Sequence, residues 1–215
     1  MKQLSYFCYI TKICLNLFLR KLNAEYCHVT NDGIEGLCVR GQCKLITVLH
    51  LRETNVTNEG IQMVLNNLPD LKELDHSVVE VLAQISQTAL DNKLVIAPKF
   101  SLAVLKIMFN TPYRSGSLGA AVSICPSVTK VVIRNDVGNV TDEDLQGLLA
   151  LERLEDLHIR GHDDTSLTFL GGIVPLLKNR GSSLKKIRTF SNRNRRYCNN
   201  SEILLNFEIP GPFPN

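Results

Sequence analysis

The chain has 215 residues, a mass of 24.1 kDa and a formal net charge of +3, enough length for one domain with a sizeable core. Hydrophobic residues make up 44% and charged residues 21%, which excludes a wholly disordered or fibrous protein, and no apolar run is long enough to predict a membrane-spanning helix. Leucine is by far the most frequent residue type, and this excess indicates a fold of stacked leucine-bearing units.

The segment 1–18 is largely apolar, with Lys2 in front and Lys12 inside it. A signal peptide would need a longer uncharged core and a small-residue cleavage site, so secretion is the weaker interpretation. We expect residues 1–18 to form an N-terminal cap or partial repeat. The seven cysteines include no CxxC pair, which favours reduced thiols in a cytoplasmic or nuclear protein over disulfides or a zinc site.

Two segments of the chain repeat one another. Residues 22–34 read LNAEYCHVTNDGI, and residues 49–61 read LHLRETNVTNEGI, and the two align without a gap. Copies of the pattern LxxLxL, some of them loose, begin at residues 19, 46, 71, 102, 128, 154 and 184. Most of these steps lie near the range of about 20–29 residues that is typical of leucine-rich repeats.

Each LxxLxL predicts a short strand whose alternate side chains point inward. We expect parallel strands near residues 19–24, 46–51, 102–107, 128–133 and 154–159. Thr30, Thr57 and Thr141 follow three of these units and are placed to cap a helix, with the hydroxyl accepting from a first-turn amide. Apolar residues at helical spacing come next, such as Ile61 and Val64. No unit can bury this apolar face alone, so the units must stack.

The unit that begins at Leu71 is longer than the others, because the next copy starts only at Leu102. Asp75 and His76 break its pattern, and turn-forming residues follow at 91–93 and 97–99. We therefore expect a longer loop around residues 90–101 that leaves the repeat pattern locally.

Residues 27–34, with the sequence CHVTNDGI, resemble the cysteine-containing class of leucine-rich repeats. In that class a Cys follows the strand, and a Cys-Pro pair precedes the next strand; Cys125-Pro126 and Pro69 hold the second place, whereas Thr54 replaces the first Cys in one unit. The resemblance implies an α/β leucine-rich-repeat solenoid of six or seven repeats over residues 19–190, with parallel strands on the concave face and helices on the convex face. We expect residues 191–215 to form a flexible tail, and Cys27 and Cys125 to be buried and unpaired.

Such repeats are typical of F-box/leucine-rich-repeat proteins and of antagonist-of-mitotic-exit-like proteins. In F-box members the repeats hold the substrate, and a separate F-box docks to a cullin-type (SCF) ubiquitin ligase; the segment before residue 19 is too short for an F-box, so ubiquitin-ligase subunits are expected as partners only of a longer form. The resemblance thus implies a protein-protein interaction module that recognises a substrate in a ubiquitin-ligase pathway. A ligase-independent adaptor or scaffold is one alternative.

Nucleic-acid binding is the other alternative, because residues 178–196 contain eight basic residues and no acidic one. Only Phe190 and Tyr197 place aromatic rings near this stretch, and a nucleic-acid site usually offers more of them. A solvated last repeat followed by a tail explains the stretch more simply.

The positions between the leucines of LxxLxL alternate outward, so their side chains project from the concave face. His50 and His158 hold the same position four units apart, about 20 Å at about 5 Å per strand, which is too far to share a metal ion. The mixed charges of this face suit a protein partner better than an apolar ligand. The residues expected to contact that partner are His50, Arg52, Glu73, Asp75, Lys106, Lys130, Arg134, Asp156, His158 and Arg160. The same rows also hold Asn23, Val132, Arg188, Lys21, Glu25 and Lys186.

We find no catalytic constellation in the sequence. The run His162-Asp163-Asp164 resembles a small acidic metal cluster but is better explained as a turn before a helix. The segments 115–119 and 171–172 are glycine-containing yet match no phosphate-binding motif. We therefore expect a protein that is not an enzyme, with no metal, cofactor, small-molecule ligand or membrane contact.

Overall fold

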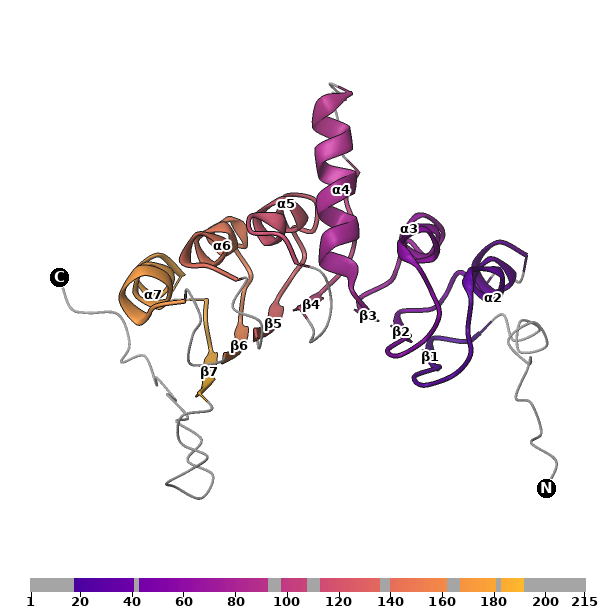
Figure 1. The fold of residues 1–215 in the computed structure, drawn as a ribbon, viewed down its shortest axis with the longest axis horizontal. Coiled ribbons are helices and arrows are strands. Elements are labelled where there is room, and N and C mark those ends of the chain that lie inside the picture. The colour runs from indigo at the N-terminus through magenta and orange to yellow at the C-terminus, as the bar shows by residue number, and fades with distance from the viewer. Residues whose placement is uncertain are drawn as a thin grey trace, which may run out of the picture.

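The computed structural model describes residues 18–40, 43–92, 98–107, 113–135, 140–161, 167–180 and 183–191. Within these ranges the chain is an α/β protein with one seven-stranded sheet. Figure 1 shows the strands along the inner side of an arc and the helices along its outer side. Except for Phe18 and Ser191, the expected N-terminal cap and C-terminal tail lie outside the described residues.

The sheet follows the order of the chain, and every neighbouring pair of strands is parallel. The strands are β1 (Lys21–Asn23), β2 (Val48–His50), β3 (Glu73–Asp75), β4 (Val104–Ile107), β5 (Lys130–Asn135), β6 (Asp156–Gly161) and β7 (Lys186–Ser191). The expected parallel strands are thus confirmed, each beginning two positions after the first leucine of its pattern. Parallel strands need a crossover connection, and in this chain the helical segments supply it.

The register places one apolar residue of each strand opposite the next. Leu22 pairs with Leu49 and Leu49 with Leu74, and Leu105, Val131 and Leu157 continue the column further along the sheet. Of these residues, all but the partly buried Leu22 are fully buried beneath the helices. Because side chains alternate along a strand, the residues on both sides of this column face away from the helices.

The helical segments pack on the face of the sheet that carries this buried column. The α-helices are α2 (Asn31–Glu35), α3 (Asn58–Asn67), α4 (Val78–Asp91), α5 (Ser117–Ser123), α6 (Asp142–Gly147) and α7 (Val174–Arg180). Shorter turns extend them: η1 (Gly36–Arg40), η2 (Leu148–Ala150) and η3 (Phe169–Ile173). None of the described helices is both long and apolar enough to cross a membrane.

Thr30, Thr57 and Thr141 are the N-cap residues of α2, α3 and α6, as the sequence predicts. The expected role of their hydroxyls is wrong for α2 and α3, which have no side-chain cap hydrogen bond. The Thr57 hydroxyl instead donates to Glu59 at 3.1 Å and accepts from Asn31 at 2.8 Å, so it joins two neighbouring units. In α6 the Asp144 carboxylate accepts from the Thr141 amide at 2.9 Å.

Polar side chains at the helix starts connect one unit to the next. Asn31 accepts from the Thr57 amide at 3.0 Å, and Asp142 accepts from the Thr168 amide at 2.7 Å. Gly60 lies where Asn31 passes, and a Cβ at this position would collide with the Asn31 amide group. These hydrogen bonds link neighbouring units on the helix side of the sheet.

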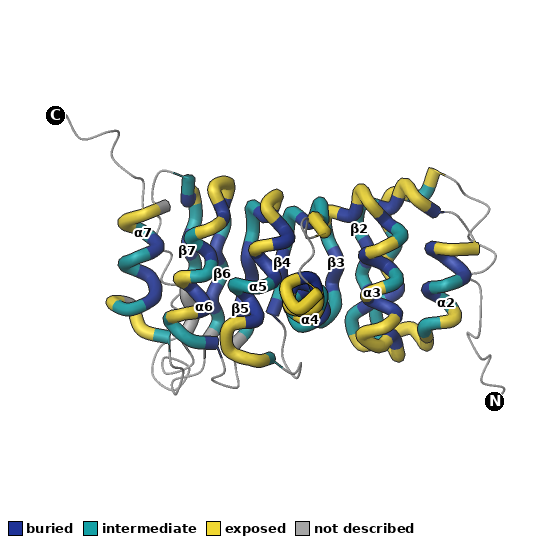
Figure 2. Tube along the Cα trace, turned by 90° about the horizontal axis from the view of Figure 1, so that it is seen from above, coloured by how far each residue is buried: buried dark blue, intermediate teal, exposed yellow. Residues whose placement is uncertain are grey.

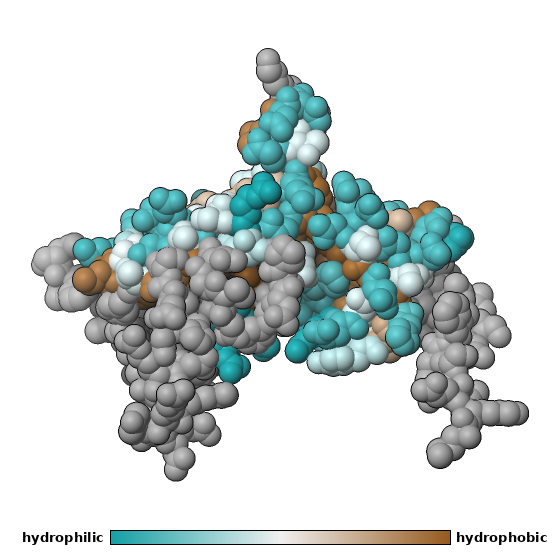
Figure 3. All heavy atoms as spheres, viewed as in Figure 1, coloured by the Kyte–Doolittle hydropathy of each residue, from teal (hydrophilic) through white to brown (hydrophobic). Residues whose placement is uncertain are grey.

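Helix α4 departs from the arrangement of the other helices. It projects outward from the arc (Figure 1), and its far end is exposed in the view from above (Figure 2). Hydrophilic residues cover much of the projecting part (Figure 3), although Leu90 is exposed near its end. The loop expected at residues 90–101 is wrong at its start, because α4 continues to Asp91. Residues 98–101 have no helix or strand, and residues 93–97 lie outside the described part.

Cys125 is buried and forms no disulfide, as expected. Burial raises the pKa of its thiol to about 12, against a smaller opposing effect of Lys99. The expected burial of Cys27 is wrong, because this residue is exposed. Cys27 belongs to the first described unit, whose outer side no other described unit covers, whereas Thr54 holds the same place one unit later and is half-buried.

Candidate functional site on the inner face of the sheet

The sheet surface that points away from the helices, which we call the inner face, presents ordered rows of side chains. In its middle row Asn23 pairs with His50 and His50 with Asp75, and further along Val132 pairs with His158 and His158 with Arg188. Lys106 joins the two parts of the row, since it pairs with Val132 and its ammonium lies 3.1 Å from Asp75. The row therefore crosses all seven strands.

The ten residues predicted to contact a partner all belong to this region. Nine of them lie on strands β2 to β6, while Arg52 follows β2 and its guanidinium carbon lies 5.8 Å from the centre of the Tyr26 ring. In the row nearer the strand starts, the strand register places Lys130 opposite Asp156 and Asp156 opposite Lys186. In the row nearer the strand ends, it places Arg134 opposite Arg160. That these residues contact a partner stays a prediction.

In the half of the inner face formed by β1 to β4, three carboxylates gather around His50. The His50 Nδ1 lies 3.5 Å from a Glu25 carboxylate oxygen, and its Nε2 lies 3.6 Å from Glu73 Oε1. Asp75 is the third carboxylate and is only 8% exposed. Glu25 comes after β1, and its backbone amide donates to the Asn23 side chain at 2.9 Å.

Lys106 connects two of these carboxylates. Its ammonium donates to Glu73 at 2.8 Å and to Asp75 Oδ2 at 3.1 Å. Burial alone would lower the pKa of Lys106, but the hydrogen bonds to Glu73 and Asp75 outweigh that effect and raise the pKa above its ordinary value. Lys106 is therefore a fixed positive charge that orients both carboxylates.

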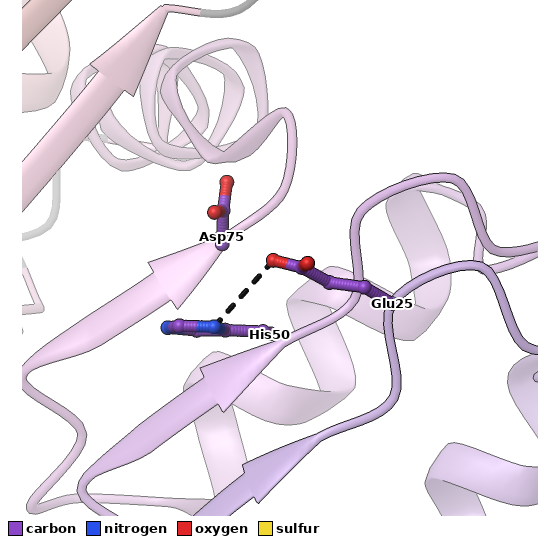
Figure 4. Close-up of side chains that lie close together, drawn as sticks. All are labelled: Glu25, His50 and Asp75. Carbon is purple, nitrogen blue, oxygen red and sulfur yellow. Dashed lines mark ion pairs between the residues drawn. The ribbon is translucent and has the colours of Figure 1, made fainter.

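Among the described side chains around this group, Asp75 Oδ1 and His50 Nε2 are buried without a hydrogen-bond partner. Figure 4 shows the Glu25, His50 and Asp75 side chains close together. One ligand atom from each lies within 4.8 Å of the others, and this is the one group of three metal-ligating side chains with such spacing among the residues that the structure describes. Carboxylate oxygen and imidazole nitrogen are both ligands of divalent metal ions.

The half of the inner face formed by β5 to β7 has the opposite balance of charge. Among the described residues of these strands, five basic residues accompany one carboxylate, Asp156, which lies 3.2 Å from the Lys130 ammonium. The five are Lys130, Arg134, Arg160, Lys186 and Arg188. The pKa of His158 is lowered by burial and then by Arg188 and Arg134, with Asp156 opposing. Burial, the largest of these causes, acts whatever the local charge, whereas Arg188 and Arg134 act as neighbouring positive charges.

The basic stretch at residues 178–196 is divided by the fold. Lys178 is exposed on α7, on the helix side, whereas Lys186 and Arg188 lie on β7 and belong to the inner face. Lys185 pairs with Glu155 at 2.9 Å. The last three basic residues of the stretch lie outside the described residues. Within the described part, the stretch is therefore not one continuous surface, and its β7 portion adds to the basic half.

The other segments considered in the sequence have structural roles where they are described. Near the start of α5, the Gly116 amide donates to Asp144 at 2.8 Å, and Tyr113 donates to the same carboxylate at 2.6 Å. Gly171 and Gly172 lie against the Asp142 carboxylate. In both places a carboxylate of the chain occupies the space that a phosphate would need. Residues 162–164 lie outside the described part.

The sequence placed Glu25, His50 and Asp75 in the rows of the inner face but did not bring them together. By residue type, His50 matches only His158, because both are histidines in the same repeat position. Alignment of the first three units carries the missing signal, since it puts His50 beside Asp75 and places Glu25 two positions beyond Asn23. Comparison of the chain with protein-family models and with curated proteins finds no match.

Proposed function

We propose that the protein binds another protein across the inner face of its sheet, and that its repeated units form a leucine-rich-repeat solenoid. The observation that supports this most is the row from Asn23 to Arg188, which is polar on every strand except at Val132 and crosses seven strands while the described helices pack on the other face (Figure 1). A long surface of polar and charged side chains suits a protein partner better than a small molecule. Binding rather than catalysis is the proposed activity.

The charges suggest the chemistry of the partner. The cations of β5 to β7 favour an acidic surface on the partner, since complementary charges increase the association rate and disfavour wrong partners. The β1 to β4 half combines carboxylates with Lys106 and is suited to a partner surface of mixed charge. We therefore propose that an acidic segment of the partner lies over β5 to β7.

The resemblance of residues 27–34 to cysteine-containing repeats supports recognition of a substrate in a cullin-type ubiquitin-ligase pathway, in the cytoplasm or nucleus. An adaptor or scaffold without a ligase would use the same face. Affinity purification followed by mass spectrometry separates these two roles, because only the first predicts co-purification of cullin-ligase subunits.

Nucleic acid is the second candidate, and the five cations of the basic half are the observation that favours it. Asp156 lies within that half, and Glu73 and Asp75 lie on the neighbouring half, where they would repel phosphates. Binding of random-sequence RNA or DNA that weakens steeply with salt would support this candidate over a protein partner.

The test reverses two charges on the inner face and compares them with two matched charges elsewhere. The face variant is Lys186→Glu with Arg188→Glu, and the control is Lys72→Glu with Lys178→Glu, both pairs of exposed or half-buried cations. Thermal melting first checks that both variants have the melting temperature of the wild type. Each variant is then used as bait beside the wild type, and the captured proteins are quantified. We expect the face variant to lose partners that the control retains. If the face variant captures every partner at the wild-type level, the proposed surface is wrong.

A further inference from the structure

We propose that Glu25, His50 and Asp75 form a binding site for one divalent transition-metal ion of the zinc type. The three residues come from β1, β2 and β3 or the turn directly after, so neighbouring units of the sheet supply one ligand each. Figure 4 shows the three side chains close together. This proposal goes beyond the proposed function, because metal binding is a property of the isolated chain and needs no partner.

The distances between the donor atoms suit such an ion. Zinc binds imidazole nitrogen and carboxylate oxygen at about 2.0–2.2 Å in a tetrahedral arrangement, which separates two ligand atoms by about 3.3–3.6 Å. The His50 Nδ1 and the Glu25 oxygen are already 3.5 Å apart. All three ligand atoms lie within 4.8 Å of one another, so a shift of about 1 Å in the side chains completes the site.

The charges of this group also favour a cation. Glu25, Glu73 and Asp75 bring three carboxylates to one place, and Lys106 is the one cation that the structure places in contact with Glu73 and Asp75. With a neutral imidazole this leaves an excess of two negative charges. Asp75 is only 8% exposed, and its buried Oδ1 atom has no hydrogen-bond partner. A divalent ion would neutralise the excess and give that oxygen a ligand bond.

The surroundings of the three ligands resemble the outer shell of a metal site. A histidine that binds a metal through one ring nitrogen usually directs the other toward a carboxylate, which fixes the ring. With Nδ1 as the ligand, His50 Nε2 lies 3.6 Å from Glu73 Oε1. Lys106 in turn holds Glu73 at 2.8 Å and Asp75 Oδ2 at 3.1 Å, so it positions Glu73 and leaves Asp75 Oδ1 for the ion.

The ligand set selects the kind of metal. One imidazole with two carboxylates suits zinc and neighbouring transition metals, whereas calcium and magnesium prefer ligand sets made of oxygen alone. Three protein ligands leave a fourth position toward the inner face for water or for a ligand atom of a bound partner. The described cysteines do not belong to this group.

His158 provides a matched control within the same molecule. It holds the same place in β6 that His50 holds in β2, in the middle row of the inner face. Burial lowers the pKa of the His158 imidazole most, and the positive charges of Arg188, Arg134 and Lys130 lower it further, with Asp156 opposing them. The same potential repels a metal ion. The proposal therefore assigns metal binding to His50 and excludes it for His158.

The experiment titrates the purified full chain with Zn²⁺ by calorimetry and with Co²⁺ by visible absorption. We expect one saturable ion per chain. Removal of one of three ligands by His50→Ala or Asp75→Asn should weaken binding by more than about 100-fold, and the outer-shell change Glu73→Gln by about 10-fold. The control His158→Ala should bind within about twofold of the wild type, and bound Co²⁺ should show ligand-field bands without a thiolate charge-transfer band.

Thermal melting without metal checks that each variant is folded, and His50, with a side chain that is 27% exposed, tolerates truncation better than a core residue. The proposal is overturned if the wild type shows no saturable binding below about 1 mM. It is equally overturned if His158→Ala weakens binding as much as His50→Ala, if both ligand variants bind like the wild type, or if the Co²⁺ spectrum shows thiolate ligation.

Discussion

The two halves of the inner face are built on the same repeated strand yet have opposite electrostatic character. His50 lies among Glu25, Glu73 and Asp75, whereas His158 lies among cations. The buried column beneath them is the same in kind, with Leu49 under one half and Leu157 under the other. The apolar positions of the repeat therefore determine the fold, while the positions between them are free to specify different ligands on one continuous surface.

The two halves of the inner face share one buried apolar column. Leu49→Ala and Leu157→Ala each remove a fully buried side chain from the column, so each should lower the free energy of unfolding by about 3–5 kcal/mol. Urea denaturation measures both. The comparison predicts similar costs, and a difference above about 2 kcal/mol would show that the two halves do not rest on an equivalent core.

A smaller effect concerns the ion pairs that distinguish the halves. Lys106→Met should cost about 2–3 kcal/mol, because it leaves the buried Asp75 and the half-buried Glu73 carboxylates without their cation; the Lys106 side chain is 16% exposed. The matched Lys130→Met removes a pair in which Lys130 is 41% exposed and should cost less than about 1 kcal/mol. Equal costs in urea denaturation would contradict the comparison.

The same lysine predicts a dependence on alkaline pH. Because the pKa of Lys106 in the folded protein is raised above its ordinary value of 10.5, its contribution is complete below that pH and is lost as pH rises through the raised pKa. Burial and Asp144 raise the pKa of Tyr113, which gives wild type and variant the same additional loss at high pH. Wild type should therefore lose more stability than Lys106→Met above about pH 10.5, measured by denaturation at each pH. Parallel curves for the two proteins would refute this role.

The smallest effect concerns the imidazole of His158. Arg188→Gln removes the cation that lowers the His158 pKa most after burial, so the pKa should rise toward 6.5, as followed by NMR. A lowered folded-state pKa means that stability falls as pH drops below 6.5, because the unfolded chain takes up the proton first. His76 acts in the same direction through burial, and His76→Gln serves as the comparison. An unchanged His158 pKa in Arg188→Gln would remove the electrostatic reason for treating the halves as different.

The sequence predicted much of the sheet, because leucine spacing within each unit is local information. Parallel order and the row from Asn23 to Arg188 follow from it directly. The projecting helix did not follow: the long step from Leu71 to Leu102 was visible, but residues 90–91 were expected as loop although they complete the helix over 78–91. Cys27 is exposed because it lies in the first described unit, whose outer side no other described unit covers. The contacts of Glu25, His50 and Asp75 depend on three units meeting in register, which no single unit reveals.

The most direct test of the two-halves account is paramagnetic relaxation of the metal-free protein by a positively and a negatively charged nitroxide of similar size. The ratio of the two effects at protons near His50 and near His158 reports the sign of the local potential. We predict that the positive probe relaxes the His50 region more strongly and the negative probe the His158 region. The same sign of preference at both histidines would contradict the division of the inner face.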